Sequence, residues 1–404
     1  MFTNQSLSNA GKNAGKLISG KSALAAALLF ALPATAAVKL KDAVNDTEFS
    51  FGGYMKVDAF WSDFSDGSLA SGNIGRQFYV PSTVPVCEFE GCEDSTTTFD
   101  GHSRATRFNF GTLTNIDGHK VKTFLEMDFL ATPGGNELVS NSYSPRLRHA
   151  FISYDNWLVG QTWTTFQNTG ALPESLDFLG PSESTIFERQ AMVRYTYGAW
   201  QFSLENPESL VMNNGGNGRI DCDDSALPDI VARYNHTADW GQLSVSGLLR
   251  QLKIDDANYD STTSAYGISV AGKVKLGADD IRFMGSYGSG MGRYIGLAIT
   301  SDAVLDDKGE LEAIDSYGGF VAYRHMWTEE LRSTLSYSVF SADNETQYTG
   351  RSATKSADSI HLNLIYSPIK SLSVGVEYIR ANRELENGYD GDLDRLQFSA
   401  KYVL

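Results

Sequence analysis

Apolar and polar residues alternate with a period of two along most of the chain. In one such run Leu243, Val245 and Leu249 alternate with Ser244 and Arg250. This period predicts β-strands that present one apolar and one polar face. The strands are predicted at 51–62, 102–112, 119–129, 145–154, 157–163, 187–197, 199–205, 229–236, 241–251, 264–276, 280–288, 314–326, 329–340, 358–367, 370–381 and 394–404.

The connections between these runs fall into two classes of length. The short ones are 115–118, 155–156, 198, 237–240, 277–279, 327–328 and 368–369. The long ones are 63–101, 130–144, 164–186, 206–228, 252–263, 289–313, 341–357 and 382–393. Short periplasmic turns and long extracellular loops are typical of an outer-membrane barrel. The fold class predicted is therefore all-β, a transmembrane antiparallel β-barrel of about sixteen strands with both termini on the periplasmic side.

Two other all-β folds, a secreted sandwich and a propeller, would also show alternation. Neither explains the two classes of loop or the alternating terminal run 396–404. Tryptophans near strand ends fit the aromatic girdles of a barrel. They are Trp61, Trp157, Trp163, Trp200, Trp240 and Trp327.

The N-terminus has the pattern of a targeting segment. Lys12, Lys16 and Lys21 precede an apolar run at 23–32 and small residues at 33–37, which predicts a signal peptide at 1–37 and export. Beyond it, no apolar run approaches the length of a membrane helix. The organisation expected is a signal peptide (1–37), a short periplasmic segment (38–50) and a β-barrel porin domain (51–404).

Segment 164–186 breaks the pattern. It follows two closely spaced strand runs, lacks alternation, and contains two prolines, two glycines and the acids Glu174, Asp177 and Glu183. A long, partly apolar loop after two tight strands is what a porin uses to narrow its pore. We therefore expect 164–186 to be a constriction loop.

The charge is unevenly distributed. The 404 residues carry a formal net charge of −16, and such an acidic chain disfavours nucleic acid as a partner. With the apolar face of each strand placed toward lipid, the inward positions hold fifteen bases and eight acids. The bases are Lys56, Lys120, Lys122, Arg146, Arg148, Arg194, Arg233, Arg250, Lys273, Lys275, Arg282, Arg324, Arg332, Arg395 and Lys401. The acids are Asp58, Glu126, Asp128, Glu188, Glu205, Asp229, Glu330 and Glu377.

The remaining acids are expected to concentrate in the long loops. Examples are Glu88, Glu90, Glu93, Asp94, Asp221, Asp223, Asp224, Asp302, Asp306, Asp307 and Glu310.

Arginines on alternate strands suggest a path for anions. Arg107, Arg148, Arg194 and Arg233 are predicted at similar depth along one wall, with Arg146 beside them. Arg104 and Arg189 are placed nearer the mouth, although their spacing from Arg107 and Arg194 conflicts with a regular strand and requires a bulge or a rim position. Guanidinium groups bind carboxylates bidentately and remain charged, so a row of them forms a multi-site anion path. The loop acids Glu174, Asp177 and Glu183 would oppose this row across the constriction. The alternative for each arginine is a structural ion pair that fixes the loop.

Several motifs resemble the DcaP-like porin family. They are RLRHA (146–150), GQTWT (160–164), PESLDF (173–178), RQ (189–190), RYT (194–196), LENPE (204–208) and GYMKVD (53–58). The resemblance covers most of 51–208. It implies a sixteen-stranded homotrimeric porin that takes up small anions, with dicarboxylates as type substrates. Some members carry a coiled-coil extension before the barrel, for which 38–50 leaves no room.

Other signals are weaker. Cys87 and Cys92 bracket four residues in an exported loop, which predicts a disulfide, and the role of Cys222 stays open. Asp221, Asp223 and Asp224 could bind Ca²⁺, but a solvated acidic loop is favoured and no metal site is predicted. Acidic loops could also meet divalent cations among lipopolysaccharide phosphates. His149 is assigned outward, at a subunit interface where Gly160 would allow close approach.

The function predicted is passive diffusion of small, anionic solutes such as dicarboxylates through the outer membrane of a Gram-negative bacterium. No cofactor is implied, and no Ser/His/Asp set predicts an enzyme. One alternative is a non-selective or cation-preferring porin whose lumen arginines are neutralised by loop acids. Another is an adhesion or binding barrel that acts through its long acidic loops.

Overall fold

The computed structural model describes residues 38–42, 46–89, 91–92, 94–132 and 139–404. The signal peptide predicted at 1–37, and the loop acids Glu90 and Glu93, lie outside the described residues. Sixteen antiparallel strands form a closed barrel, which confirms the predicted fold class. They are β2 (Thr47–Phe64), β4 (Arg107–Ile116), β5 (His119–Asp128), β6 (Arg146–Tyr154), β7 (Trp157–Trp163), β8 (Arg189–Tyr197), β9 (Trp200–Glu205), β12 (Asp229–Ala238), β13 (Gly241–Asp255), β14 (Asp260–Leu276), β15 (Asp279–Ser289), β18 (Asp315–Met326), β19 (Leu331–Asp343), β20 (Thr354–Ile369), β21 (Leu372–Leu385) and β22 (Asp390–Val403).

Strand β2 closes the barrel. Residues 54–64 of β2 pair with β22, and residues 47–54 pair with β4. On the edge that pairs with β4, residues 58–64 of β2 pair with β3 (Thr96–His102). Strands β3 and β4 therefore act as one strand that is interrupted at 103–106. Every strand of the barrel therefore has two neighbours, as a sheet in hydrocarbon requires.

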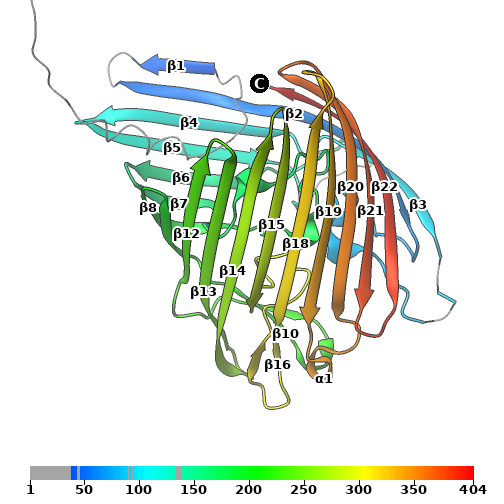
Figure 1. Cartoon of the computed structure of the whole chain (residues 1–404). Helices are drawn as coiled ribbons and strands as arrows, with labels where there is room; N and C mark the ends of the chain where they lie inside the picture. The colour runs from blue at the N-terminus through cyan, green and yellow to red at the C-terminus, as the bar shows by residue number, and fades with distance from the viewer. Residues whose placement is uncertain (1–37, 43–45, 90, 93, 133–138) are drawn as a thin grey trace, which may run out of the picture.

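The segment before the barrel contains a strand that the sequence pattern did not predict. Strand β1 (Val38–Asp42) pairs with residues 47–51 of β2, which begins four residues before the predicted run. Figure 1 shows β1 beside β2, at the same end of the barrel as the C-terminus.

The outer face is apolar. Met55, Val57 and Trp61 alternate along β2 with the buried Lys56, Asp58 and Phe60, and the same alternation recurs on β14 and β20. Exposed Leu, Ile, Val and aromatic side chains on outward positions match a lipid environment. In the part of the chain that is described, no helix is long and apolar enough to cross a membrane.

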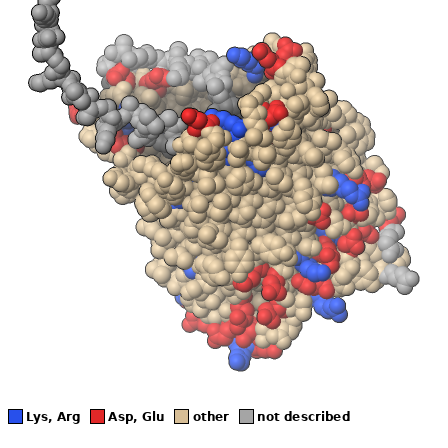
Figure 2. Space-filling view, viewed as in Figure 1, with Lys and Arg blue, Asp and Glu red and all other residues tan. Residues whose placement is uncertain are grey.

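A second, smaller sheet covers the extracellular end. It consists of β10 (Ser209–Met212), β11 (Arg219–Cys222), β16 (Ala303–Leu305) and β17 (Leu311–Ala313). Figure 1 places β10, β16 and the short helix α1 (Thr346–Thr349) at the end opposite the C-terminus. Figure 2 shows acidic side chains gathered at this end, where Asp255, Asp307 and Glu310 are exposed.

Three loops fold into the extracellular half of the barrel and form a core there. Phe166 and Ile186, from the loop between β7 and β8, pack with Tyr294 and Ile295, from the loop between β15 and β16. Segment 65–95 contributes Tyr79 and Val84 to a second cluster against β21 and β22. The loops contain single 3₁₀ turns: η1 (Ile74–Arg76), η2 (Pro81–Thr83), η3 (Thr169–Ala171), η4 (Ser182–Ser184) and η5 (Asn214–Gly216). The barrel is therefore filled on one side rather than open throughout.

We predict that Gly53→Ala will weaken barrel closure. Gly53 has φ of 135°, and a Cβ there would lie 2.0 Å from the carbonyl oxygen of Arg107 on the neighbouring strand. Its own carbonyl accepts a hydrogen bond from the amide of Leu404 (3.0 Å). Forcing a side chain into this conformation should lower the free energy of unfolding by about 1–3 kcal/mol, measured by urea unfolding in detergent micelles.

The matched control is Gly247→Ala in β13. A Cβ at Gly247 meets nothing within 4 Å, so this variant should unfold at the same urea concentration as the wild type. Equal stability of the two variants would contradict the role assigned to Gly53.

The pore wall and its basic residues

The loop 164–186 runs along the inner wall, and polar side chains from several strands hold it there. Asn168 donates a hydrogen bond to Ser244 of β13 (2.8 Å), and Arg282 of β15 donates to the carbonyl of Leu172 (2.5 Å). The amide of Leu176 donates to Glu377 of β21 (2.5 Å), and Gln397 of β22 donates to the carbonyl of Leu176 (2.9 Å). The loop therefore covers the inner faces of the strands from β13 to β22.

Two of the arginines assigned to the pore hold the beginning of this loop. Arg194 donates to the hydroxyl of Thr165 (2.7 Å) and to the carbonyl of Trp163. Arg233 donates to the carbonyl of Gln167 and to Gln201 (3.0 Å). Because their donors bond the loop backbone and its neighbours, Arg194 and Arg233 have the structural role that the sequence left as the alternative.

The three loop acids do not face the arginines of β4 to β8, so the opposed arrangement expected across the constriction is wrong. Glu174 receives two hydrogen bonds from Arg332 on the far wall (2.8 and 2.7 Å). Burial raises the pKa of Glu174, but the bonds from Arg332 and the charge of Arg324 outweigh it and leave the pKa lowered. The carboxylate is therefore charged and neutralised by β18 and β19.

Asp177 and Glu183 lie behind the loop. Asp177 accepts backbone hydrogen bonds from Tyr79 (2.9 Å) and from Leu179 and Gly180 (3.2 Å each). Its burial raises its pKa. Glu183 accepts a hydrogen bond from Ser359 of β20 (2.6 Å). Both acids are buried and fix the loop to segment 65–95 and to the wall, rather than facing water.

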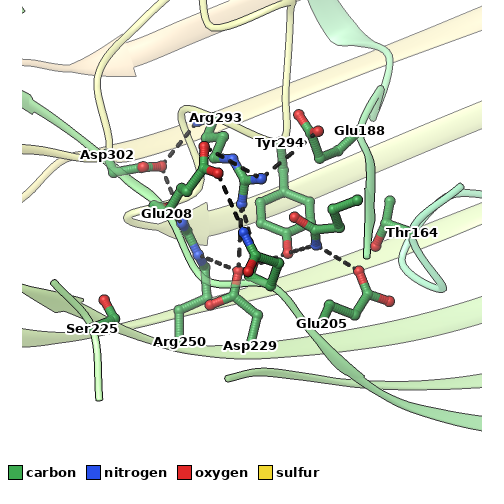
Figure 3. Close-up of polar contacts among 12 residues, drawn as sticks. Thr164, Glu188, Glu205, Glu208, Ser225, Asp229, Arg250, Arg293, Tyr294 and Asp302 are labelled. Atoms are coloured by element: carbon green, nitrogen blue, oxygen red, sulfur yellow. Dashed lines mark hydrogen bonds and ion pairs between the residues drawn. The ribbon is translucent and has the colours of Figure 1, made fainter. Parts of the chain in front are cut away.

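The second inner loop, 290–302, is held by a buried ionic network (Figure 3). Arg250 of β13 pairs with Asp229 (3.1 Å) and with Asp302 (2.8 Å). Tyr294 donates to Asp229 (2.7 Å), and Gln190 donates to the Tyr294 hydroxyl (2.7 Å). The network connects this loop to β8, β12 and β13.

Asp302 lies in a long loop, as expected, but it is not at the surface. Its side chain is fully buried because it is the counter-ion of Arg250. Loop 289–313 is thus partly inside the barrel, where Ile295 forms a β-bridge with Ile186 of the other inner loop.

Four arginines on β4, β6 and β8 form what we call the arginine cluster: Arg107, Arg146, Arg148 and Arg189. Arg146 pairs with Asp128 (2.9 Å), and Arg148 pairs with both Glu126 and Asp128 (2.8 Å each). Arg107 lies 3.5 Å from Glu126. Two acids therefore serve several arginines, and the cluster keeps an excess of positive charge.

Aromatic rings complete the arginine cluster. The guanidinium carbon of Arg189 lies 4.4 Å from the ring centre of Trp163 and 5.1 Å from that of Phe187. Arg148 lies 5.5 Å from the ring of Phe178, at the turn of the loop 164–186. No carboxylate within salt-bridge distance of Arg189 is found among the described residues. Cation–π contacts thus position a guanidinium that no acid neutralises.

Irregular backbone resolves one conflict in arginine spacing. Arg104 lies in the turn 103–106 that interrupts β3 and β4, where the amide of Thr106 donates to the carbonyl of Ser103 (3.0 Å). Arg104 is buried and lies 3.7 Å from the ring centre of Tyr143. Arg189 is the first residue of β8 and is out of phase with Arg194, so it occupies a rim position, where it lines a cavity with Phe187 and Arg293.

A bulge overturns the assignment of His149. The pairing of β5 with β6 shifts between Glu126 and Met127, so Arg148 is an extra residue in β6. His149 is therefore buried on the side of Glu126, with Nδ1 3.0 Å from the hydroxyl of Thr162. It does not lie at an outer interface. Gly160 has φ of 129° and is required by contact with β6, since a Cβ would lie 2.3 Å from the carbonyl oxygen of Ala150.

The inward acids and bases differ in exposure. Asp58, Glu126, Asp128, Glu205, Asp229, Asp280 and Glu377 are each at most 3% exposed. In contrast, the side chains of Arg107, Arg146, Lys273, Arg282, Arg324 and Arg332 are 15–28% exposed. Glu174 and Glu188 are exposed to a similar degree, but Glu174 is paired with Arg332 and Glu188 lies 3.8 Å from Arg293. Arg148, Arg194, Arg250 and Arg395 are buried like the acids. The charged surface that faces the lumen is therefore mainly basic.

Sequence reasoning missed two kinds of residue. Asp280 pairs with three inward bases, and the alternation that placed Arg282 inward could have identified it. Arg293 and Tyr294 lie in a loop without periodicity, so no local signal indicated that they are inside the barrel.

The cysteines and loop acids complete the set of candidate sites. Cys87 and Cys92 are joined in a disulfide with their Cα atoms 5.7 Å apart. Cys222 is a free thiol buried among apolar residues of the extracellular sheet, and burial raises its pKa to about 11. Among the residues that the structure describes, no group of three or more His, Cys, Asp or Glu could hold a metal.

Comparison with known proteins identifies the family to which this barrel belongs. The family model for the DcaP outer membrane protein matches residues 20–404. The chain belongs to the DcaP family. Members are outer-membrane proteins, so the protein resides in the outer membrane of a Gram-negative bacterium. Its family and fold are those of a porin channel. A search among curated proteins finds no match.

Solved structures resemble this DcaP-family chain over most of its length. The outer membrane channel DcaP of Acinetobacter baumannii aligns with a TM-score of 0.73 and 24% identity, covering 90% of this chain and 99% of that one. An anion-selective porin from Comamonas acidovorans aligns with a TM-score of 0.51 and 11% identity, covering 89% and 100%. The trimer form of OmpT from Vibrio cholerae gives 0.51 and 10%, covering 89% and 99%.

We predict that Arg250→Ala will release the second inner loop. The substitution leaves Asp229 and Asp302 buried without their counter-ion, a change that costs about 3–5 kcal/mol. Urea unfolding should show this loss of stability, and single-channel recordings should show larger, noisier conductance because 290–302 leaves the barrel. The matched control, Arg380→Ala, removes an exposed arginine from β21 and should change neither property. Unaltered conductance and stability in Arg250→Ala would contradict this anchoring role.

Proposed function

We propose that this porin conducts small anions in preference to cations. The observation that carries the proposal is the difference in exposure on the inner wall, where seven acids are buried and six bases are partly exposed to the lumen. A solute that carries a negative charge then meets guanidinium and ammonium groups in both the extracellular and the periplasmic half of the barrel. A cation meets few free carboxylates.

The arginine cluster is the proposed recognition site. Its planar guanidinium groups offer pairs of donors that match a carboxylate. Dicarboxylates fit this site best among small anions, because Arg146 and Arg189 lie on different strands and each could bind one end of the solute. Both Glu126 and Asp128 compete with the solute, which keeps binding weak enough for passage.

The positions and partners of the loop acids weigh against the cation-preferring alternative. That alternative needs acids that neutralise the arginines of β4 to β8, whereas Glu174 pairs with Arg332, and Asp177 and Glu183 are buried. The acidic side chains gathered at the extracellular end (Figure 2) would affect the entry of solutes.

The reversal potential under a KCl gradient in a planar bilayer tests the proposal. The wild type should show the sign for chloride selectivity. Arg146→Gln and Arg189→Gln should each lower the chloride-to-potassium permeability ratio by about fivefold, as expected for loss of ~1 kcal/mol of attraction.

Arg380→Gln serves as the control, because Arg380 is exposed on β21 and pairs with Asp392 and Asp394. Its ratio should match that of the wild type. A cation-selective wild type would overturn the proposed function while leaving the barrel intact.

We also propose a homotrimer. The outer face of β2 to β7 has an apolar groove of about 630 Å³, lined by Phe49, Phe110, Leu125, Ile152 and Val159 among others, which another copy could fill. Light scattering of the purified complex, corrected for detergent, should give three chains. A monomeric mass would be incompatible with this assembly.

A further inference from the structure

Four neighbouring strands carry a second group of bases near their periplasmic ends. Lys273 of β14, Arg282 of β15, Arg324 of β18 and Arg332 of β19 form what we call the basic band. Each lies within a few residues of a short periplasmic turn. The arginine cluster lies on β4, β6 and β8, nearer the extracellular ends and on the opposite wall.

Two acids serve the four bases of the band. Asp280 contacts Arg324 (2.6 Å), Arg282 (2.7 Å) and Lys273 (3.5 Å). Glu174 contacts Arg332 (2.7 Å) and Arg324 (3.8 Å). Since one carboxylate neutralises one positive charge, the band keeps an excess of two positive charges.

The excess charge is accessible from the lumen. Asp280 is buried, whereas all four bases are partly exposed. Lys273 makes one long ion pair, to Asp280, so its ammonium retains donors for a solute. Arg332 also bonds the hydroxyl of Ser367 (2.9 Å), which extends the polar surface toward β20.

We propose that the basic band is a second anion-binding station at the periplasmic exit. This inference rests on the proposed anion preference and adds a distinct site on the other side of the loop 164–186. Its ligands are small oxyanions with carboxylate or phosphate groups. An anion that leaves the arginine cluster is received by the band before release, and because the band shares its charge with two carboxylates it binds weakly.

The band also explains how the loop 164–186 is coupled to the exit. Glu174 and the carbonyl of Leu172 are held by Arg332 and Arg282, so these two arginines both position the loop and present charge to the lumen. Within the described part of the chain, Lys273 pairs with Asp280 rather than with the loop, so it can be changed without releasing the loop.

The experiment is block of chloride current by inorganic pyrophosphate, added to either side of a bilayer in which channels have inserted in one orientation. Pyrophosphate added to the periplasmic side should block the wild type with an apparent affinity that differs from that of block from the extracellular side. Lys273→Gln, and more strongly Lys273→Gln with Arg324→Gln, should weaken periplasmic block by about fivefold or more. Extracellular block should change less than about twofold.

Two further variants separate charge from structure. Arg324→Lys keeps the positive charge and should retain periplasmic block. Lys370→Gln removes a base from the exposed turn after β20, outside the band, and should behave as wild type.

The outcomes are distinguishable. A wild type that selects cations overturns the proposed function and this inference together. A wild type that selects anions but shows the same block after Lys273→Gln with Arg324→Gln overturns the second station alone. Equal weakening from both sides would also overturn it, because that result indicates loosening of the loop rather than loss of a local site.

Discussion

The structure depends on satisfying every backbone hydrogen bond within the membrane. Strand β2 meets this constraint by pairing with β22 and β4 in one part and with β3 in another. The close approach at Gly53 belongs to the same closure. In the regular parts of the closed sheet, side-chain direction follows from position along each strand, so closure divides the strands into a lipid face and an inner face.

A barrel this wide has an interior to fill, and ionic anchors determine how. Apolar residues of the loops 164–186 and 290–302 form a core with inward residues of β12 to β20. Arginines give the arrangement its specificity, because Arg194, Arg233 and Arg250 bond particular carbonyls or acids of these loops. Each arginine that fixes a loop is one less available to a solute. The arginines left for the proposed anion path are therefore Arg189, which has no acid partner among the described residues, and those that share an acid.

Much of the fold could be predicted from sequence, since alternation is a local property of each strand. All sixteen strand runs correspond to barrel strands, and the inward placement of Arg146, Lys273 and Arg324 followed from the same phase. Alternation does not predict side-chain direction where the backbone is irregular. The extra residue at Arg148 turned His149 inward, and the turn at Arg104 has no strand phase at all. The buried position of Asp302 depends on Arg250, fifty-two residues earlier, and no local pattern reports such a partner.

Side-chain length underlies the exposure difference on the inner wall. Arginine and lysine have long flexible stems that carry the charge away from the backbone, whereas aspartate holds its charge close to it. On a crowded inner surface the long cations therefore reach past the short anions, as Arg282 and Arg324 do past Asp280. The sign of the field inside the barrel is thus set by reach as well as by number of charges. A protein of net charge −16 can in this way present a positive interior, and an exchange of aspartate for glutamate on the wall would alter that interior without altering the charge of the chain.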